Sequence, residues 1–284
     1  MRRVLFHLPF GDPGPPIFAY GFMLMLGFLA GIALAVWRAR REGIPESAIY
    51  DIAICAIVSG IVGARVMWVW RFAEPWQLQG PIDYIAVWNG GLVYYGGLLL
   101  ALATCTAYVL YKRLPLGRTA DCFAPGLGVG LGFGRIGCFL NGCCFGAPCP
   151  VDAWYAVRFP ADAPAALQHA ELGLTQGGAS LPVYPTQLFA SAAGFLIGGL
   201  ILLLFRYRRF PGQMILAFVL LYSAARFLIE FFRADTLPRL WDLKEGQLVA
   251  APVFVAAAAL TAILWIRAAR RRKGSGPEEA DRGA

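Results

Sequence analysis

The sequence predicts an all-α, polytopic membrane protein with about seven transmembrane helices and a small extracytoplasmic head. Of its 284 residues, 58% are hydrophobic and 15% are charged, and the mean hydropathy is +0.60. A soluble domain needs a charged surface that this composition cannot supply. Basic residues form short clusters between apolar runs, so membrane topology, rather than nucleic-acid binding, explains the net charge of +8.

A membrane-spanning helix needs roughly 20 mostly apolar residues. Seven segments come close to this length, and turn or breaker residues such as Pro211-Gly212 separate them. In chain order, the predicted spans are Phe18–Trp37, Ala48–Trp70, Gly90–Tyr111, Asp121–Leu140, Thr186–Phe205, Gln213–Phe232 and Leu248–Ile266.

The loops predict the orientation, because fourteen basic residues follow the first, third, fifth and seventh spans. They are Arg38, Arg40, Arg41, Lys112, Arg113, Arg118, Arg206, Arg208, Arg209, Arg267, Arg270, Arg271, Arg272 and Lys273. The positive-inside rule makes that side cytoplasmic. We therefore expect the N-terminus outside and the C-terminus in the cytoplasm.

The same topology places the longest loop, residues 141–184, outside as the extracytoplasmic head. We expect short strands in it around Trp154–Phe159. The length suits one helical bundle, so we predict a single membrane-embedded domain over residues 1–272. A disordered cytoplasmic tail is predicted over residues 273–284.

Ionisable residues occur inside the predicted spans, where they are costly and usually functional. They are Arg65, Arg135, Arg226, Glu230 and Arg233, all toward the outer ends of their helices. The last three are spaced i, i+4, i+7 and share one helical face. Arginines converging beneath the outer leaflet would suit a phosphate head group. Snorkelling of Arg233 and a structural ion pair for Arg135 are the alternatives.

Glycine recurs at alternate positions from Gly126 to Gly134 in the fourth span. Close helix packing is one interpretation, since small residues let helices approach. Close approach of the backbone to a ligand is the other.

The seven cysteines include Cys138, Cys143, Cys144 and Cys149, whose spacing misses the usual pairs of zinc sites. With two histidines in the chain, nitrogen ligands are scarce. We expect no metal site, no cofactor and no disulfide scaffold, and small apolar packing as the role of Cys138 and Cys143. A membrane thiol redox function using Cys143, Cys144 and Cys149 remains an alternative.

A set of short motifs runs over nearly the whole chain. The central motif is Gly134-Arg-Ile-Gly-Cys-Phe-Leu-Asn-Gly-Cys-Cys-Phe-Gly146. The other motifs, in chain order, are Tyr20-Gly21, Gly63-Ala-Arg65, Gly90-Gly-Leu-Val-Tyr-Tyr-Gly-Gly97, Asp121, Tyr184-Pro-Thr-Gln187, Arg226-Phe-Leu-Ile-Glu-Phe-Phe-Arg233 and Gly246-Gln247. In these motifs and their order, the sequence resembles the prolipoprotein diacylglyceryl transferase family.

This resemblance implies transfer of a diacylglyceryl group from phosphatidylglycerol to the lipobox cysteine of a prolipoprotein signal peptide. A thioether forms and glycerol 1-phosphate leaves, as the first step of lipoprotein maturation. The implied catalytic residues are Tyr95, Arg135, Arg226 and Glu230. The implied substrate-binding residues are Tyr20, Arg65, Asn141, Gly146 and Arg233.

The chain departs from the family pattern at the expected base. Tyr95 stands where many members carry histidine, and a tyrosine with a pKa near 10 is a poor base at neutral pH. Cys138, Tyr184 and Ala190 also replace asparagine, histidine and an acidic residue. A non-catalytic protein that binds or transports anionic phospholipid is therefore the alternative function.

Overall fold

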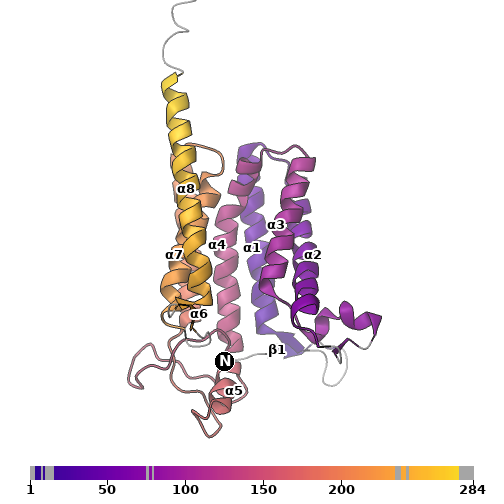
Figure 1. Cartoon of the computed structure of the whole chain (residues 1–284), viewed down its shortest axis with the longest axis vertical. Helices are drawn as coiled ribbons and strands as arrows, with labels where there is room; N and C mark the ends of the chain where they lie inside the picture. The colour runs from indigo at the N-terminus through magenta and orange to yellow at the C-terminus, as the bar shows by residue number, and fades with distance from the viewer. Residues whose placement is uncertain are drawn as a thin grey trace, which may run out of the picture. The chain divides into compact units, whose positions relative to one another are not determined.

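The computed structural model describes residues 4–7, 9, 16–74, 77–78, 80–233, 238–240 and 243–274 (Figure 1). The chain forms two compact units. The larger unit comprises Met1–Leu34 with Phe123–Ala284, and the smaller unit comprises Ala35–Cys122.

Seven helices among the described residues are long and apolar enough to cross a membrane, which confirms the predicted fold class. They are α1 (Ala19–Glu42), α2 (Glu46–Arg71), α3 (Tyr94–Tyr111), α4 (Leu116–Asn141), α6 (Thr186–Leu204), α7 (Gln213–Glu230) and α8 (Glu245–Gly274). A 3-10 turn, η4 (Phe205–Tyr207), continues α6. The described residues also form two short antiparallel strand pairs. Strand β1 (Val4–His7) pairs with β2 (Pro16–Phe18), and β3 (Pro238–Leu240) pairs with β4 (Leu243–Lys244).

Several helix boundaries follow from glycine and proline. Gly43 directly follows α1 and has φ of 69°, and Gly142 directly follows α4 and has φ of 76°. Glycine adopts this left-handed conformation without strain, so it commonly ends a helix. Pro45 precedes α2, and Gly212 with φ of 91° precedes α7. Helix α8 runs to Gly274, past the predicted start of the tail, and residues 275–284 lie outside the described residues.

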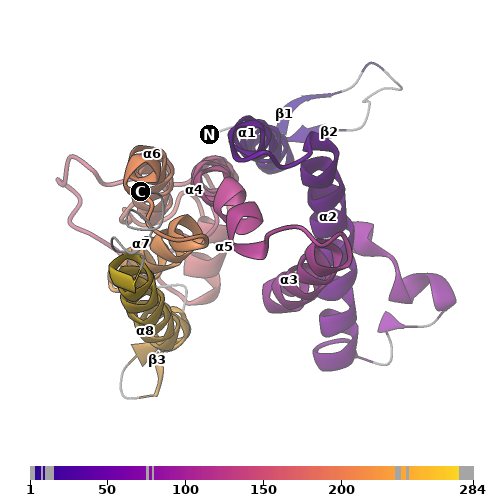
Figure 2. The same cartoon turned by 90° about the horizontal axis from the view of Figure 1, so that it is seen from above.

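In the smaller unit, α2 and α3 pack side by side through glycines (Figure 2). A Cβ atom on Gly63 would lie 2.5 Å from the Gly96 carbonyl oxygen, and one on Gly97 would lie 2.6 Å from the Gly60 carbonyl oxygen. The two backbones are thus too close for any side chain at these positions. Two 3-10 turns, η2 (Pro81–Tyr84) and η3 (Val87–Asn89), lie in the connection between the helices.

In the larger unit, the alternate glycines of α4 pack against two neighbouring helices, α1 and α6. A Cβ atom on Gly126 would lie 2.5 Å from the Gly31 carbonyl oxygen in α1, and one on Gly128 would lie 2.7 Å from the Gly198 nitrogen in α6. Helix packing is therefore confirmed as a role for these glycines. Helix α7 packs against both α6 and α8. Residues of α4, α6 and α7 form a buried core of Ala124, Ile197, Ile201, Met214 and Phe218.

The head, residues 142–185, contains a short helix, α5 (Pro164–Glu171), at the end of α4 (Figure 1). Instead of the expected strands around Trp154–Phe159, the described head shows isolated bridges such as Val157 to Val183. The head contains several prolines, which lack the backbone N–H group that hydrogen bonding between strands needs. Its core is the buried cluster of Phe145, Phe159, Ala163, Ala165 and Val183.

Candidate functional site

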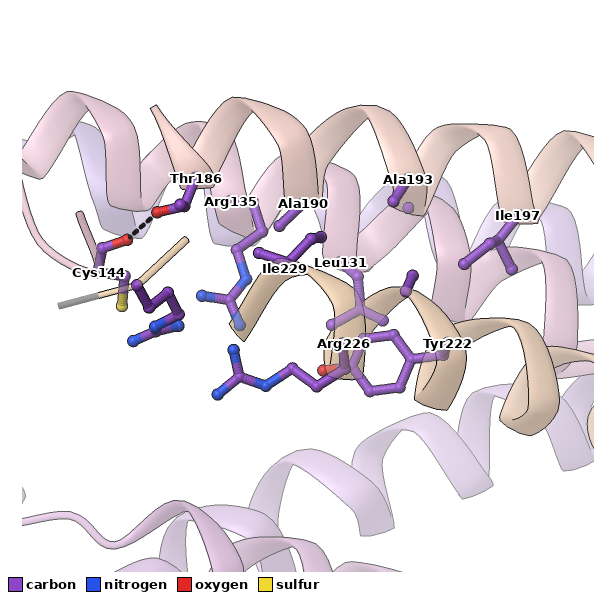
Figure 3. A pocket seen from close by; sticks show the side chains of 13 residues that line it. Leu131, Arg135, Cys144, Thr186, Ala190, Ala193, Ile197, Tyr222, Arg226 and Ile229 are labelled. Carbon is purple, nitrogen blue, oxygen red and sulfur yellow. Dashed lines mark hydrogen bonds between the residues drawn. The ribbon is translucent and has the colours of Figure 1, made fainter. Parts of the chain in front are cut away.

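A pocket in the larger unit is lined by α4, α6, α7 and the loop that follows α4 (Figure 3). Arg135 projects into it from α4, Arg226 from α7, and Arg233 from just beyond the end of α7. Apolar residues including Leu131 and Ile197 line its other part. The pocket thus combines cationic groups with an apolar wall, which suits an amphiphilic ligand with an anionic head.

Glu230 is the acidic partner of Arg226 and Arg233 and is completely buried. Its Oε2 lies 2.7 Å from Nη1 of Arg226 and 3.9 Å from Nε of Arg233. The i, i+4 pair confirms the shared face expected from the sequence. Helix α7 ends at Glu230, so Arg233 lies in the following turn rather than on the predicted helix.

The first turn of α8 closes around the same carboxylate. A Cβ atom on Gly246 would lie 2.7 Å from Oε2 of Glu230, so only glycine leaves room there. The ammonium of Lys244 donates to the carbonyl oxygens of Glu230 and Arg233, at the C-terminal end of α7. A cation at a helix C-terminus is favourable, because the helix dipole is negative there.

The pocket concentrates positive charge. Three guanidinium groups line it, and Arg135 and Arg233 are close enough to repel each other. A buried excess of like charge is costly unless an anion offsets it. The geometry therefore favours a ligand with at least one negative charge.

The loop after α4 is tied to α6 and α7 by backbone contacts. Gly146 bridges to Arg233, and its amide donates to the Tyr184 carbonyl oxygen at 3.0 Å. A Cβ atom on Gly146 would lie 2.6 Å from that oxygen and 2.8 Å from the Phe232 carbonyl oxygen. Gly146, predicted as substrate-binding, thus allows the contact that holds Arg233 in place.

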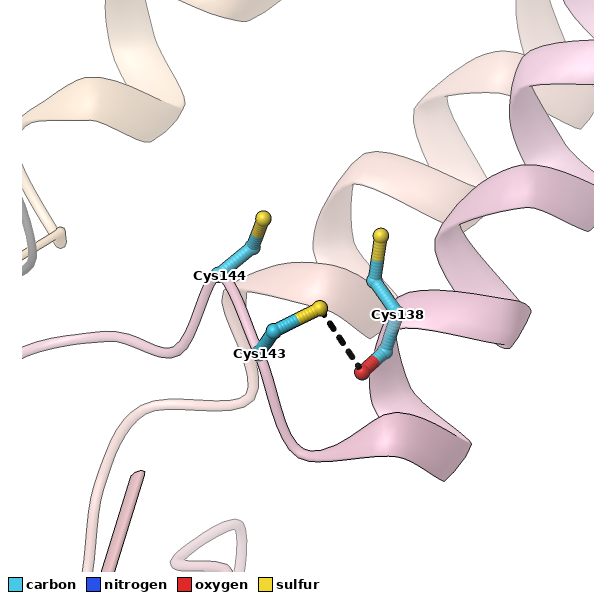
Figure 4. A group of neighbouring side chains, drawn as sticks. All are labelled: Cys138, Cys143 and Cys144. Carbon is cyan, nitrogen blue, oxygen red and sulfur yellow. Dashed lines mark hydrogen bonds between the residues drawn. The ribbon is translucent and has the colours of Figure 1, made fainter. Parts of the chain in front are cut away.

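Three cysteine thiols gather beside the pocket (Figure 4). The sulfur atoms of Cys138, Cys143 and Cys144 all lie within 4.8 Å of one another, although their spacing predicted no such group. Cys144 also lines the pocket with the arginines. Hydrogen bonds with the other two thiols lower the pKa of Cys144, and the charges of Arg135 and Arg233 lower it further.

Two buried side chains at the start of α6 hold this pair of adjacent cysteines. Thr186 donates its hydroxyl to the Cys144 carbonyl oxygen at 3.0 Å, and Gln187 donates Nε2 to the Cys143 carbonyl oxygen at 2.9 Å. Cys144 has φ of 58°, which is uncommon for a residue with a side chain. Such conformations persist where the surroundings enforce them.

Two other predicted residues lie in the same region of the larger unit. The ring of Tyr20, near the start of α1, would contact a Cβ atom on Gly137 at 3.1 Å, and its hydroxyl interacts electrostatically with Arg135 and the three thiols. Asn141, the last residue of α4, forms a side-chain hydrogen bond with Cys143.

The remaining predicted residues, Arg65 and Tyr95, belong to the smaller unit. The Arg65 guanidinium donates to the carbonyl oxygens of Asp83, Tyr84, Gly90 and Gly91 at 2.5 to 3.2 Å. These contacts organise the connection before α3. Tyr95 lies in the first turn of α3 with 38% of its surface exposed. The roles predicted for both residues stay predictions.

Sequence reasoning gave no role to four residues near the pocket, which are Thr186 and Gln187 of α6, Lys244 of β4 and Gly246 of α8. Thr186, Gln187 and Gly246 stand in motifs that carried the family resemblance, so a signal was available. Lys244 had no such signal, because its partners are main-chain carbonyl groups.

Comparisons with known proteins show the family to which the chain is similar. The family model for prolipoprotein diacylglyceryl transferase matches residues 4–263. The phosphatidylglycerol–prolipoprotein diacylglyceryl transferase 2 of Clostridium perfringens (strain 13 / Type A) is 31% identical over 83% of this chain and 86% of its own. Proteins named phosphatidylglycerol–prolipoprotein diacylglyceryl transferase from Finegoldia magna and Corynebacterium efficiens are each 32% identical, over 86% and 94% of this chain and 89% and 82% of their own.

Proposed function

The chain belongs to the prolipoprotein diacylglyceryl transferase family, and we propose that it transfers the diacylglyceryl group of phosphatidylglycerol to a cysteine thiol of a prolipoprotein. The observation that carries this proposal is the pocket that Arg135, Arg226 and Arg233 line beside the buried carboxylate of Glu230. The phosphodiester of phosphatidylglycerol carries a negative charge, and guanidinium groups pair with phosphate through two N–H donors.

The reaction is a substitution at the glycerol carbon that carries the phosphate. The sulfur of the acceptor attacks this carbon, the carbon–oxygen bond breaks, and its electron pair goes to the phosphate oxygen. The products are a thioether and glycerol 1-phosphate, and lipoprotein maturation begins with this step. Arg135 and Arg226 stabilise the charge that develops on the leaving phosphate, and Glu230 orients Arg226.

The other predicted residues take supporting roles in this proposal. Tyr20 and Asn141 line the space for the head group, and Gly146 fixes Arg233. Tyr95 positions the acceptor thiol or passes its proton through water. Arg65 supports the connection between α2 and α3, and Tyr95 lies directly after this connection.

We further propose the setting of the reaction. Residues 1–272 act as one membrane-embedded domain of the bacterial inner membrane, with the N-terminus outside and the C-terminus cytoplasmic. Phosphatidylglycerol enters laterally from the outer leaflet, which suits the apolar wall of the pocket. The acceptor is the lipobox cysteine of a signal peptide inserted in the same membrane.

Incubation of the purified chain with labelled phosphatidylglycerol and a lipobox peptide tests the function. Mass spectrometry should show a peptide carrying diacylglyceryl as a thioether. Arg135→Ala and Arg226→Ala should each lower the rate by roughly a hundredfold or more, the usual cost of removing one charge-stabilising donor. The exposed Arg40→Ala serves as the control and should keep the wild-type rate.

Two results would contradict the proposal. Full activity of both pocket variants would remove the anion-site role of the arginines. Binding of phosphatidylglycerol by the wild type without any modified peptide would instead indicate the alternative, a lipid-binding protein that performs no chemistry.

A further inference from the structure

The three thiols beside the pocket have the ligand set and spacing of a soft-metal site. Zinc binds cysteine sulfur at about 2.3 Å, so two sulfurs on one tetrahedral ion lie roughly 3.8 Å apart. The sulfur atoms of Cys138, Cys143 and Cys144 lie within 4.8 Å of one another. Small side-chain rotations therefore bring all three onto one ion.

The backbone around these thiols is already fixed. The Cys143 amide donates to the Cys138 carbonyl oxygen at 3.1 Å, which closes the loop between the two ligands. Thr186 and Gln187 hold the carbonyl groups of Cys144 and Cys143. Three ligands from the end of α4 and the next few residues thus need no large rearrangement to bind.

We propose that Cys138, Cys143 and Cys144 bind one zinc ion as thiolates and leave the fourth position open for the sulfur of the acceptor cysteine. Three protein ligands with one open position are the usual arrangement of a catalytic zinc site. This inference rests on the proposed function, because it assigns the metal to the substrate thiol of that reaction.

The location of the site supports this assignment. Cys144 lines the same pocket as Arg135, Arg226 and Arg233, so a sulfur bound beside it lies close to where the phosphate binds. Zinc with three thiolates carries one negative charge, and the neighbouring Arg135 and Arg233 offset that charge. Among the described residues, Tyr20, Tyr222, Arg226 and Glu230 are further ionisable groups in this region of the larger unit.

Zinc binding explains how the acceptor thiol is activated although Tyr95 stands where many family members carry histidine. On binding zinc, the acceptor thiol gives up its proton to water and stays as a metal-bound thiolate. The sulfur then attacks the glycerol carbon, and the electron pair of the broken carbon–oxygen bond goes to glycerol 1-phosphate, which takes up one proton from solvent. Atoms and charge balance without an oxidant or reductant.

Metal content gives the first test. The full chain, purified in mild detergent under reducing, oxygen-free conditions, should hold about one zinc per chain by elemental analysis. Cys144→Ser and Cys143→Ser should each lose most of it. Cys149→Ser, a change in the same extracytoplasmic segment but outside the cluster, should keep it.

Cobalt in place of zinc tests the open position directly. The cobalt-loaded chain should show sulfur-to-cobalt charge-transfer absorption, and a lipobox peptide should change this spectrum. A peptide with serine in place of cysteine should leave it unchanged. An unchanged spectrum with both peptides would overturn the fourth-ligand role, even in a chain that binds the metal.

The rate of lipidation separates this inference from the proposed function. A free thiol with a pKa near 8.5 is only a few per cent ionised at pH 7, so removing zinc with a chelator should lower the rate by up to roughly thirtyfold there. The loss should shrink toward pH 8.5, and added zinc should restore the rate. A chain that lipidates the peptide but binds neither zinc nor cobalt, or that forms a Cys138–Cys143 or Cys138–Cys144 disulfide instead, would refute the metal site and leave the transferase function standing.

Discussion

At the scale of single residues, Glu230 determines how the arginines of the pocket are held. It is fully buried, pairs with Arg226 at 2.7 Å and lies 3.9 Å from Arg233. Gly246 packs directly on its carboxylate. A buried ion pair contributes little net stability, but removal of one partner is costly because the other charge is left uncompensated.

Glu230→Gln should therefore destabilise the chain and lower lipidation together. The expected loss is about 3 kcal/mol or more, because the buried arginines lose their counter-charge. Thermal unfolding in detergent and the peptide assay measure the two effects. Glu46→Gln is the control, because its pair with Arg40 is exposed and such surface pairs contribute little to stability. A Glu230→Gln chain as stable and active as the Glu46→Gln chain would contradict this account.

His169 makes the head sensitive to pH. It is 2% exposed, its Nδ1 accepts the Leu181 amide at 3.2 Å, and its ring packs edge-on against Phe145. Burial lowers the pKa of His169 below its ordinary value of 6.5. The unfolded chain then takes up a proton at a higher pH than the folded head, so stability is complete above pH 6.5 and falls as the pH drops through that value.

The difference in Tm between the wild type and His169→Asn should therefore change between pH 8 and pH 5. The wild type should lose more stability than the variant on acidification, because the asparagine oxygen accepts the Leu181 amide without titrating. His7, the other histidine of the sequence, is exposed in β1, and His7→Gln should keep the wild-type pH dependence. Parallel Tm curves for the wild type and His169→Asn would exclude the effect.

At the scale of elements, the length of the apolar segments predicted the seven long helices. Some of these helices extend beyond the predicted spans. Helix α4 begins at Leu116 rather than Asp121, and α8 continues to Gly274 rather than Ile266. The difference has a physical reason. Hydropathy reports the apolar stretch, whereas the helix continues through polar residues at the membrane surface until a turn residue ends it.

The head was not predictable in the same way. Helix α5 has eight residues, with three of them buried, and its stability comes from the cluster around Phe159 rather than from its own sequence. Val157 meets Val183 through a single bridge, which leaves no alternating pattern to detect.

The glycine contact between α2 and α3 gives a prediction with a matched control. Gly97→Ala should destabilise the chain by about 1–3 kcal/mol, because the new Cβ atom would lie 2.6 Å from the Gly60 carbonyl oxygen and 3.3 Å from Cβ of Ala64. Gly60→Ala should be neutral, because nothing lies within 4 Å of its Cβ position. Thermal unfolding of both variants makes the comparison, and equal Tm values would contradict the close packing.

At the scale of the whole molecule, the sequence predicted the arginines of the pocket but not the thiols beside it. The i, i+4 spacing of Arg226 and Glu230 on one helix is local, and their ion pair follows from helix geometry. The cysteine cluster instead depends on the turn at Gly142 and on Thr186 and Gln187, which are more than forty residues further along the chain. No spacing rule contains that information.

Orientation in the membrane is the other property that only the whole chain defines. Helix α6 has nineteen residues, so it rises about 28 Å, close to the thickness of the hydrocarbon core. The head precedes it, and the basic residues Arg206, Arg208 and Arg209 follow it. The two ends of α6 therefore face opposite sides, and the basic end should be cytoplasmic.

A membrane-impermeant maleimide should label Cys149 of the head in intact cells. Burial raises the pKa of the Cys149 thiol, so labelling is best done above neutral pH. In a Cys149→Ser background, a cysteine introduced by Tyr207→Cys, where the tyrosine is 58% exposed, should react only after the membrane is opened. Peptide mapping by mass spectrometry identifies the labelled site among the other cysteines. The reverse pattern would place the head in the cytoplasm, on the side opposite to an exported signal peptide, and would contradict the proposed encounter of the acceptor cysteine with the pocket.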